Sequence, residues 1–285
     1  MIKLQNDKIN ITISEHGAEV IEGKKADGSH FIWMGDEASW SDHSPILFPI
    51  CGKLLDDEYF FNGEKYNLPF HGFAKRSDFE VLEASEETAL FSLKYNDKTL
   101  KMYPFKFDFR VRYTLKDNTV EVTFETINLD DKPLYFSAGA HEGYYLEDGI
   151  ENYYVEFDEP QTLHSCKITG KHINENTEPI IENSKHLDFK ADKYWPYDII
   201  LRDINFSAVT LYNSKGEKMI RAEFKGFPNL LFWSCPQPQS RFVCIEPWCG
   251  LPDFIDDNKN FEEKRSIVKV DAQKSYTLTH SYTVY

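Results

Sequence analysis

The sequence has few cysteines, and their spacing limits what the chain can be. Its 285 residues include five cysteines, an odd number scattered along the chain, which does not suit a disulfide framework. They also lack the paired CxxC spacing that is typical of a zinc site. We therefore interpret Cys51, Cys166, Cys235, Cys244 and Cys249 as reduced thiols of a cytoplasmic protein, mostly small core residues.

Apolar runs and positive charge are scarce as well. The N-terminal residues MIKLQNDKINITI contain no apolar signal core, and no window approaches 18 consecutive apolar residues. The chain has 32 Lys and Arg against 47 Asp and Glu, which gives a formal net charge of -15. Anionic membranes and nucleic acids repel such a chain, so we expect neither as a partner.

Familiar catalytic motifs are missing from the sequence. It contains no HExxH, no GxSxG and no phosphate-binding glycine loop. The pair Gly52-Lys53 comes nearest to such a loop but lacks the upstream glycine. These absences disfavour a zinc protease, a serine hydrolase of the α/β type and a P-loop nucleotidase.

Aromatic residues and short alternating segments are abundant instead. Aromatics make up 15% of the chain, and they favour strands and sugar-binding surfaces. Residues 107–115 and 119–125 alternate with period two around a turn, which predicts an antiparallel hairpin. Further hairpins are predicted for 59–66, around Asn62-Gly63, and for 207–224, and a long strand for 275–285.

Helical periodicity is weak throughout, so we expect little helix. No low-complexity linker divides the chain, and no fixed-period repeat is visible. We predict an all-β fold, a large antiparallel β-sandwich that forms a single domain over residues 1–285. The polar segment from Glu175 to Tyr197 is expected to be an irregular surface excursion.

Three short segments place titratable residues at the ends of apolar strands. The first, residues 68–76, holds His71 before a glycine, where the backbone is expected to bend. The second, residues 136–145, holds His141 among small residues that let a ligand approach. A histidine packed in a turn is the structural alternative for each of them.

The third segment, residues 242–253, ends the apolar run Phe-Val-Cys-Ile with Glu246. A carboxylate beside a buried strand is costly unless it is paired or used. Partial removal from water also raises the pKa of a glutamate towards neutral pH, where the residue can act as an acid or a base. Trp248 follows two residues later and is expected to offer a face to a sugar ring. A structural salt bridge is the alternative reading of Glu246.

In this order, the three segments resemble the aldose 1-epimerase (galactose mutarotase) family, and most closely its LacX-like branch. The resemblance covers nearly the whole chain and includes residues 46–52, 103–105, 226–230 and 245–248. It implies a galactose mutarotase-like β-sandwich with a sugar cleft on a concave face. The family's two histidines match His71 and His141, and its catalytic glutamate matches Glu246.

The resemblance also implies substrate-binding residues, with two departures. The family's binding aspartate matches Asp198, and Arg76 stands at the expected place after the first histidine. Lys53 stands where the family has an arginine, and a lysine is a single-point donor whereas arginine is a planar fork. Glu142 replaces a proline that often follows the second histidine, so an extra carboxylate is expected to raise the pKa of His141 or re-aim its ring.

The function implied is that of an isomerase, an aldose 1-epimerase of the EC 5.1.3 class, which interconverts the α and β anomers of a free hexose. Its partner would be a small monosaccharide, with no metal and no organic cofactor. Three alternatives remain open: a non-catalytic carbohydrate-binding or sensing protein, a hexose 6-phosphate 1-epimerase, and a glycoside hydrolase that pairs Glu246 with Asp253 or Glu142. The sequence predicts no oligomeric state.

Overall fold

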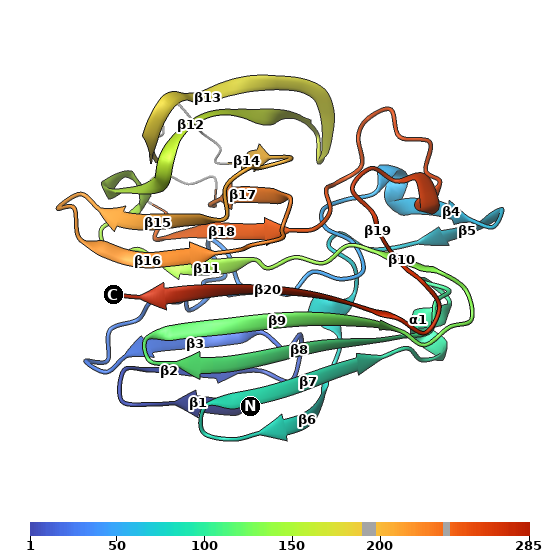
Figure 1. Ribbon diagram of the computed structural model, residues 1–285, viewed down its shortest axis with the longest axis horizontal. Helices are drawn as coiled ribbons and strands as arrows, with labels where there is room; N and C mark the ends of the chain where they lie inside the picture. The colour runs from blue at the N-terminus through green and yellow to red at the C-terminus, as the bar shows by residue number, and fades with distance from the viewer. Residues whose placement is uncertain (190–197, 236–239) are drawn as a thin grey trace.

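The computed structural model describes residues 1–189, 198–235 and 240–285, and antiparallel strands dominate it. The largest sheet runs from β13 and β12 at the top of Figure 1 to β6 at the bottom. Its nine strands follow the spatial order β13 (His172–Asp188), β12 (Tyr153–Thr169), β15 (Ala208–Asn213), β16 (Lys218–Glu223), β20 (Ser275–Val284), β9 (Thr119–Asn128), β8 (Phe107–Lys116), β7 (Thr88–Lys94) and β6 (Glu80–Ala84).

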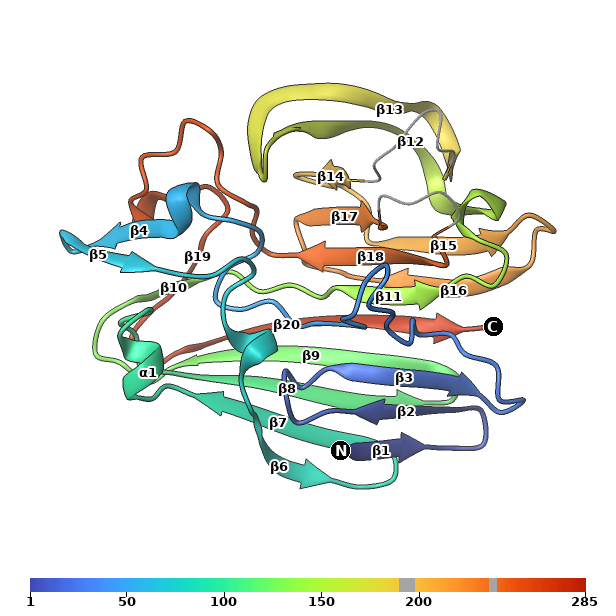
Figure 2. The ribbon, with the colours of Figure 1, turned by 180° about the vertical axis from the view of Figure 1, so that it is seen from behind.

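A second sheet carries the residues of greatest functional interest. Its strand order is β11 (Glu142–Tyr145), β18 (Phe242–Trp248), β17 (Asn229–Trp233) and β14 (Asp198–Leu201). The long β12–β13 hairpin arches over this sheet in both views (Figures 1 and 2). A three-stranded sheet of β1 (Ile2–Gln5), β2 (Ile9–Ile13) and β3 (Val20–Lys25) covers the opposite end of the large sheet (Figure 2).

The remaining elements are small. Two strand pairs, β4 (Glu58–Phe61) with β5 (Glu64–Asn67) and β10 (Leu134–Phe136) with β19 (Val268–Val270), complete the described sheets. In the part of the chain that the structure describes, helix is confined to α1 (Asp97–Leu100) and the 3-10 turns η1 (Leu55–Asp57), η2 (Ala74–Arg76), η3 (Ile150–Asn152) and η4 (Phe261–Glu263). Within the described ranges, no helix has the length and apolar character needed to cross a membrane.

The alternation in the sequence explains the strands that form. In β9 every second residue is buried and the residues between are partly exposed, as period-two patterning requires. The predicted hairpins at 107–125, 207–224 and 59–66 are confirmed. In the last of them, Asn62 and Gly63 have φ of 51° and 79°, the positive angles of a type I′ turn. The predicted all-β fold with little helix is likewise confirmed.

The prediction of an irregular surface excursion at Glu175–Tyr197 was right about exposure up to Asp188 and wrong about regularity there. Residues up to Asp188 belong to β13, which pairs with β12 along a hairpin interrupted by register shifts. Most β13 side chains are exposed, because the strand lies at the edge of the large sheet. Without a buried face, the strand has no apolar alternation, so its sequence resembles a loop. Residues 190–197 lie outside the described ranges.

Candidate active site

A cavity of about 490 Å³ lies between the four-stranded sheet, the tip of the β12–β13 hairpin and the loops that follow β3 and β5. That volume is within the range of small-molecule sites. The lining includes five of the seven residues that the sequence predicted for the site, together with further aromatic and basic side chains. The principal members are Trp40, Phe70, His71, Lys75, His141, Lys171, Asp198, Trp233, Glu246 and Trp248.

Strand alternation places the predicted acid and base on one face of the sheet. Glu142 pairs with Ile245 across β11 and β18, so the neighbouring positions His141 and Glu246 project to the opposite side, towards the cavity. His141 Nε2 lies 3.2 Å from Glu246 Oε2. The Glu246 side chain is only 1% exposed, and Oε2 makes no well-formed hydrogen bond among the described residues.

Backbone geometry fixes His71 at the same cavity. His71 and Gly72 both have positive φ, 65° and 73°, and a Cβ at Gly72 would lie 2.2 Å from the Phe48 carbonyl oxygen. The turn is tied to Gly52, whose carbonyl accepts from the His71 amide and whose N–H donates to His71 Nδ1 at 3.0 Å. Since Nδ1 accepts, the neutral ring carries its proton on Nε2 and is a donor there.

Tryptophans form the walls around the two imidazoles. The Trp40 ring lies 5.1 Å from that of His141, and the Trp233 ring meets His141 edge-on at 5.5 Å. Trp248 packs edge-on against His71 at 5.4 Å, and its indole N–H donates to the Ala140 carbonyl. Gly139 serves this packing, because a Cβ there would lie 2.4 Å from the Trp248 ring. The small residues before His141 therefore make room for a tryptophan.

Burial shapes the protonation of the three titratable groups. It raises the pKa of Glu246 well above the ordinary range, and the charges of Asp198 and Glu142 act in the same direction. Burial lowers the pKa of His141 to about 3, with a further contribution from the Lys75 charge. It also lowers the pKa of His71 well below its ordinary value. The unliganded cavity thus favours neutral forms.

Glu142 does not act on His141 as expected. Its side chain points to the core side of the sheet, where Oε1 lies 2.7 Å from Nε2 of His280. His280 belongs to β20 of the large sheet, so this buried pair joins the two sheets. The carboxylate acts instead on Glu246, whose pKa its charge raises.

Asp198 and the hairpin tip form the outer wall. Asp198 begins β14 and lines the cavity opposite Lys171, whose ammonium sits 4.8 Å from the Phe70 ring centre. The tip is anchored by backbone bonds between Ile173 and the Asp253–Ile255 segment. One wall of the cavity therefore comes from a hairpin that carries neither His141 nor Glu246.

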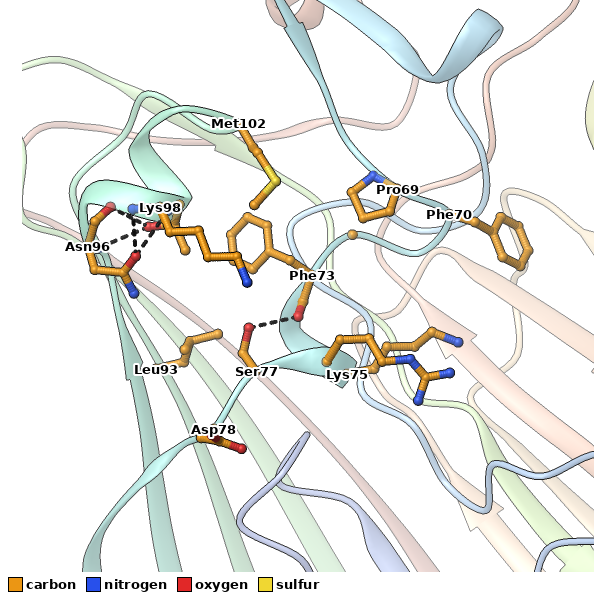
Figure 3. A pocket seen from close by; sticks show the side chains of 13 residues that line it. Pro69, Phe70, Phe73, Lys75, Ser77, Asp78, Leu93, Asn96, Lys98 and Met102 are labelled. Atoms are coloured by element: carbon orange, nitrogen blue, oxygen red, sulfur yellow. Dashed lines mark hydrogen bonds between the residues drawn. The ribbon is translucent and has the colours of Figure 1, made fainter.

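Lys53 and Arg76 do not line this cavity. The Lys53 ammonium lies 3.3 Å from Asp57, and an Arg76 nitrogen lies 3.2 Å from Asp42. Arg76 faces a neighbouring cavity of about 660 Å³ between the 69–78 segment and α1. In Figure 3, Phe70 stands at one end of that cavity and Lys98 points towards Phe73. A role for Lys53 or Arg76 in sugar binding stays a prediction.

Sequence reasoning missed several lining residues. Lys75 lines the cavity and lies 3.0 Å from Asp42, which also holds Arg76. Burial alone would raise the pKa of Asp42, but the charges of Lys75 and Arg76 hold it below its ordinary value. Lys75 stands in the His71 segment and was visible there. Trp40 lies in an unremarkable loop, and no sequence signal marked it or Lys171.

These features are shared with a known family. The sequence profile described as aldose 1-epimerase matches residues 1–283, and the chain belongs to that family. Protein LacX of Lactococcus lactis subsp. lactis, in its plasmid and chromosomal versions, is 32% identical over 300 residues, covering 98% of each chain. The predicted family and its LacX-like branch are thereby confirmed.

Solved structures agree on the fold. A galactose mutarotase related enzyme from Lactobacillus acidophilus superposes with a TM-score of 0.94 at 30% identity, covering 99% of this chain and 96% of that one. A galactose mutarotase-like protein from Lactobacillus casei gives 0.94 at 27% identity, with both chains fully covered. The galactose 1-epimerase of L. acidophilus, at 14% identity and a TM-score of 0.73, shares the fold.

Proposed function

We propose that the protein is an aldose 1-epimerase that interconverts the α and β anomers of a free hexose. The observation that carries the proposal is the His141–Glu246 pair, 3.2 Å apart and buried at the floor of a sugar-sized cavity. Mutarotation needs a base for the anomeric hydroxyl proton and an acid for the ring oxygen, both within hydrogen-bond reach of one carbon. The raised pKa of Glu246 and the lowered pKa of His141 leave one proton shared between the two groups over a wide pH range, so the pair can both accept and donate a proton.

The reaction conserves the protons of the pair. In the reactive state Glu246 is ionised and His141 is protonated. Glu246 takes the proton of the anomeric hydroxyl while His141 gives one to the ring oxygen, the bond between C1 and the ring oxygen breaks, and C1 becomes an aldehyde. Rotation about C1–C2 exposes the other face of the carbonyl. Both proton transfers then reverse, and closure yields the other anomer.

Burial favours the state that ring opening creates. After opening, Glu246 is protonated and His141 is neutral, and these are the forms that desolvation stabilises. The pair therefore moves from an ion pair to a neutral pair as the sugar opens. Forming the initial ion pair in a buried site costs free energy, and hydrogen bonds from the sugar hydroxyls must offset that cost. Binding of the sugar is therefore expected to favour the ionised state of the pair.

His71 is proposed to stabilise the charge that develops on oxygen. Its Nδ1 is occupied by the Gly52 amide, so Nε2–H is the donor left for a ligand. Asp198 and Trp248, both in the cavity lining, would hold hydroxyls and cover an apolar face of the ring. Lys53 and Arg76 do not line the cavity, so the proposal gives them only an indirect part in sugar binding.

The lining favours a free sugar over its alternatives. Among the described lining residues the cations are Lys75 and Lys171, with no arginine to clasp a phosphate in a bidentate manner. For a glycoside hydrolase, Glu142 and Asp253 were the candidate second carboxylates. Glu142 faces the core, and Asp253 lies 2.5 Å from the buried Lys264 ammonium, so neither lines the cavity.

Polarimetry on freshly dissolved glucose or galactose tests the proposal. The protein is expected to accelerate the decay of optical rotation. Glu246→Gln keeps the shape of the side chain but removes the base, so the acceleration is expected to fall by about 10²–10⁴-fold. An unchanged rate in this variant would show that Glu246 is not the base.

A sugar-binding protein without catalysis gives a different result. Calorimetry would then detect binding of the sugar, while optical rotation would decay at the uncatalysed rate with the unaltered protein. Glu223→Gln is a matched control, because this exposed glutamate on β16 lies outside the cavity. Its rate is expected to equal that of the unaltered protein.

A further inference from the structure

A cysteine stands beside the acid–base pair. Cys244 precedes Glu246 by two residues on β18 and therefore projects to the same face of the sheet. The Cys244 sulfur, a ring nitrogen of His141 and a carboxylate oxygen of Glu246 all lie within 4.8 Å of one another. Cys244 is fully buried, and the proposed mechanism gives it no part.

The three donor atoms match the preferences of zinc-class cations. Thiolate sulfur, imidazole nitrogen and carboxylate oxygen are the ligands that Zn²⁺ takes in proteins. Bonds of about 2.0 Å in a tetrahedron put nitrogen and oxygen ligands about 3.3 Å apart. His141 Nε2 and Glu246 Oε2 are already 3.2 Å apart. The Cys244 sulfur lies within 4.8 Å of both atoms, and it must stand about 3.5 Å from each to complete a tetrahedral set.

A second observation also points to a ligand at this place. Glu246 Oε2 is buried, yet none of the described residues gives it a well-formed hydrogen bond. A buried carboxylate oxygen in that condition is costly. A cation bound by Glu246 would satisfy this oxygen. His141 and Glu246 both line the cavity, which provides the path by which an ion arrives and an open fourth position.

We propose that Cys244, His141 and Glu246 form an inhibitory site for a thiophilic divalent cation such as Zn²⁺. The inference rests on the proposed function for its effect on activity, although binding of the ion stands by itself. A bound ion occupies the lone pairs of Glu246 and His141, so neither residue can exchange protons with a sugar. Binding of the ion and mutarotation therefore exclude each other.

Cobalt is a direct probe, because it occupies zinc sites and reports sulfur ligands. Metal-free protein titrated with Co²⁺ is expected to develop a thiolate-to-cobalt charge-transfer band in the near ultraviolet, which added Zn²⁺ removes. Cys244→Ser is expected to abolish the band. Cys235→Ser is the matched control, since Cys235 is another buried cysteine in the same cluster with Trp33 and Phe242 and is expected to keep the band.

Activity gives an independent measurement. Zn²⁺ is expected to abolish the acceleration of optical-rotation decay, and a chelator to restore it. Cys244→Ser is expected to raise the Zn²⁺ concentration for half inhibition by at least about tenfold, the loss that removal of even an outer-shell partner causes. Each variant is compared with its own metal-free rate, and circular dichroism verifies its fold. Should Cys244→Ser fail to fold, the cobalt affinity of Glu246→Gln replaces it and is expected to fall.

Several outcomes would overturn the proposal. They are the absence of the band in the unaltered protein, its persistence in Cys244→Ser, and an unchanged cobalt affinity in Glu246→Gln. Binding of Zn²⁺ at Cys244 without loss of activity would overturn the inhibitory role. An ion bound at an exposed pair such as His16–Asp78 would have no sulfur ligand from that pair and would give no such band. A Cys244-dependent band in a protein without mutarotation would sink the proposed function and leave the ion site standing.

Discussion

Among the described residues, two buried histidine–glutamate pairs lie on opposite sides of the paired strands β11 and β18. His141 and Glu246 lie 3.2 Å apart on the cavity side, whereas His280 and Glu142 lie 2.7 Å apart on the core side. Both pairs are almost fully removed from solvent. The first borders a cavity of about 490 Å³, and the second is enclosed between two sheets.

The difference between the pairs separates chemistry from architecture. The core pair is the shorter of the two, and it connects β11 to β20. Each pair leaves one carboxylate oxygen and one ring nitrogen without a hydrogen-bond partner among the described residues: Glu246 Oε2 and His141 Nδ1 in the first, Glu142 Oε2 and His280 Nδ1 in the second. Only the first pair borders a cavity, so only there can a ligand reach the free donor and acceptor positions. Identical residue types thus serve as a candidate active pair or as a link between sheets, according to whether they border a cavity.

The largest expected effect comes from the acid of the cavity pair. His141→Asn removes the proton donor for the ring oxygen, so the rate of mutarotation is expected to fall by about 10²–10⁴-fold. The midpoint of chemical unfolding is expected to change little, because His141 already borders a cavity. Polarimetry and urea unfolding on the same sample measure the two quantities. A large loss of stability with unchanged rate would reverse the roles assigned to the two pairs.

The core pair should respond in the opposite manner. Glu142→Ala leaves His280 buried without its partner, and breaking such a pair costs about 3–5 kcal/mol of unfolding free energy. Urea unfolding measures this loss. Where the folded fraction stays high, the rate of mutarotation per folded molecule is expected to remain within the same order of magnitude.

A double substitution tests whether the core pair is needed as a pair. Glu142→Met with His280→Leu replaces both polar side chains by apolar groups of similar size. Replacing a buried pair in this way is often neutral or stabilising by about 1–4 kcal/mol. We therefore expect the double variant to be more stable than Glu142→Ala. An equal loss in both variants would mean that the contact between the sheets requires this polar pair.

The pH profile distinguishes the pairs more finely. In the state that can react, Glu246 and His141 carry one proton between them. Below the pKa of His141, about 3, both groups are protonated and no base remains. Above the raised pKa of Glu246, both groups have lost their protons and no acid remains. Activity is therefore expected to persist well below pH 6.5, the ordinary value for histidine, as long as circular dichroism shows a folded protein.

The smallest effect concerns the alkaline limb of that profile. Asp198 and Glu142 both raise the pKa of Glu246, from the cavity side and from the core side. Removing either charge lowers that pKa, so the alkaline limb moves to lower pH in Asp198→Asn and in Glu142→Gln. Only Asp198→Asn is expected to raise the KM for the sugar as well. A shift in neither variant would contradict the electrostatic influence of both carboxylates.

Alternation predicted much of the fold, and it failed where burial gives no pattern. The hairpin at residues 107–125 is visible because one face of each strand is buried. β13 was missed because most of its side chains are exposed. The prediction for Glu142 failed for a related reason. The sequence shows that Glu142 follows His141, but it does not show that the two side chains lie on opposite sides of the sheet.

The site was predictable where residues stand at strand ends in family motifs, as Glu246, His141 and His71 do. Contributions from distant loops were not predictable. Trp40 reaches His141 across a hundred residues of sequence, and the approach of Cys244 to the pair depends on the register of β11 against β18. Arg76 was read as a direct contact because sequence distance from His71 does not reveal that its guanidinium turns towards Asp42.

The anchored tip of the β12–β13 hairpin has a consequence for specificity. Ile168, Gly170, Lys171 and Ile173 supply one wall of the cavity, while the proton-transfer groups are Glu246 of β18 and His141, the residue before β11. One wall of the cavity, which helps to set its size and polarity, thus comes from a different part of the sequence than the residues proposed to transfer protons. Grafting a longer or shorter arm between Tyr153 and Asp188 is a route to admit another sugar while the chemical step is kept.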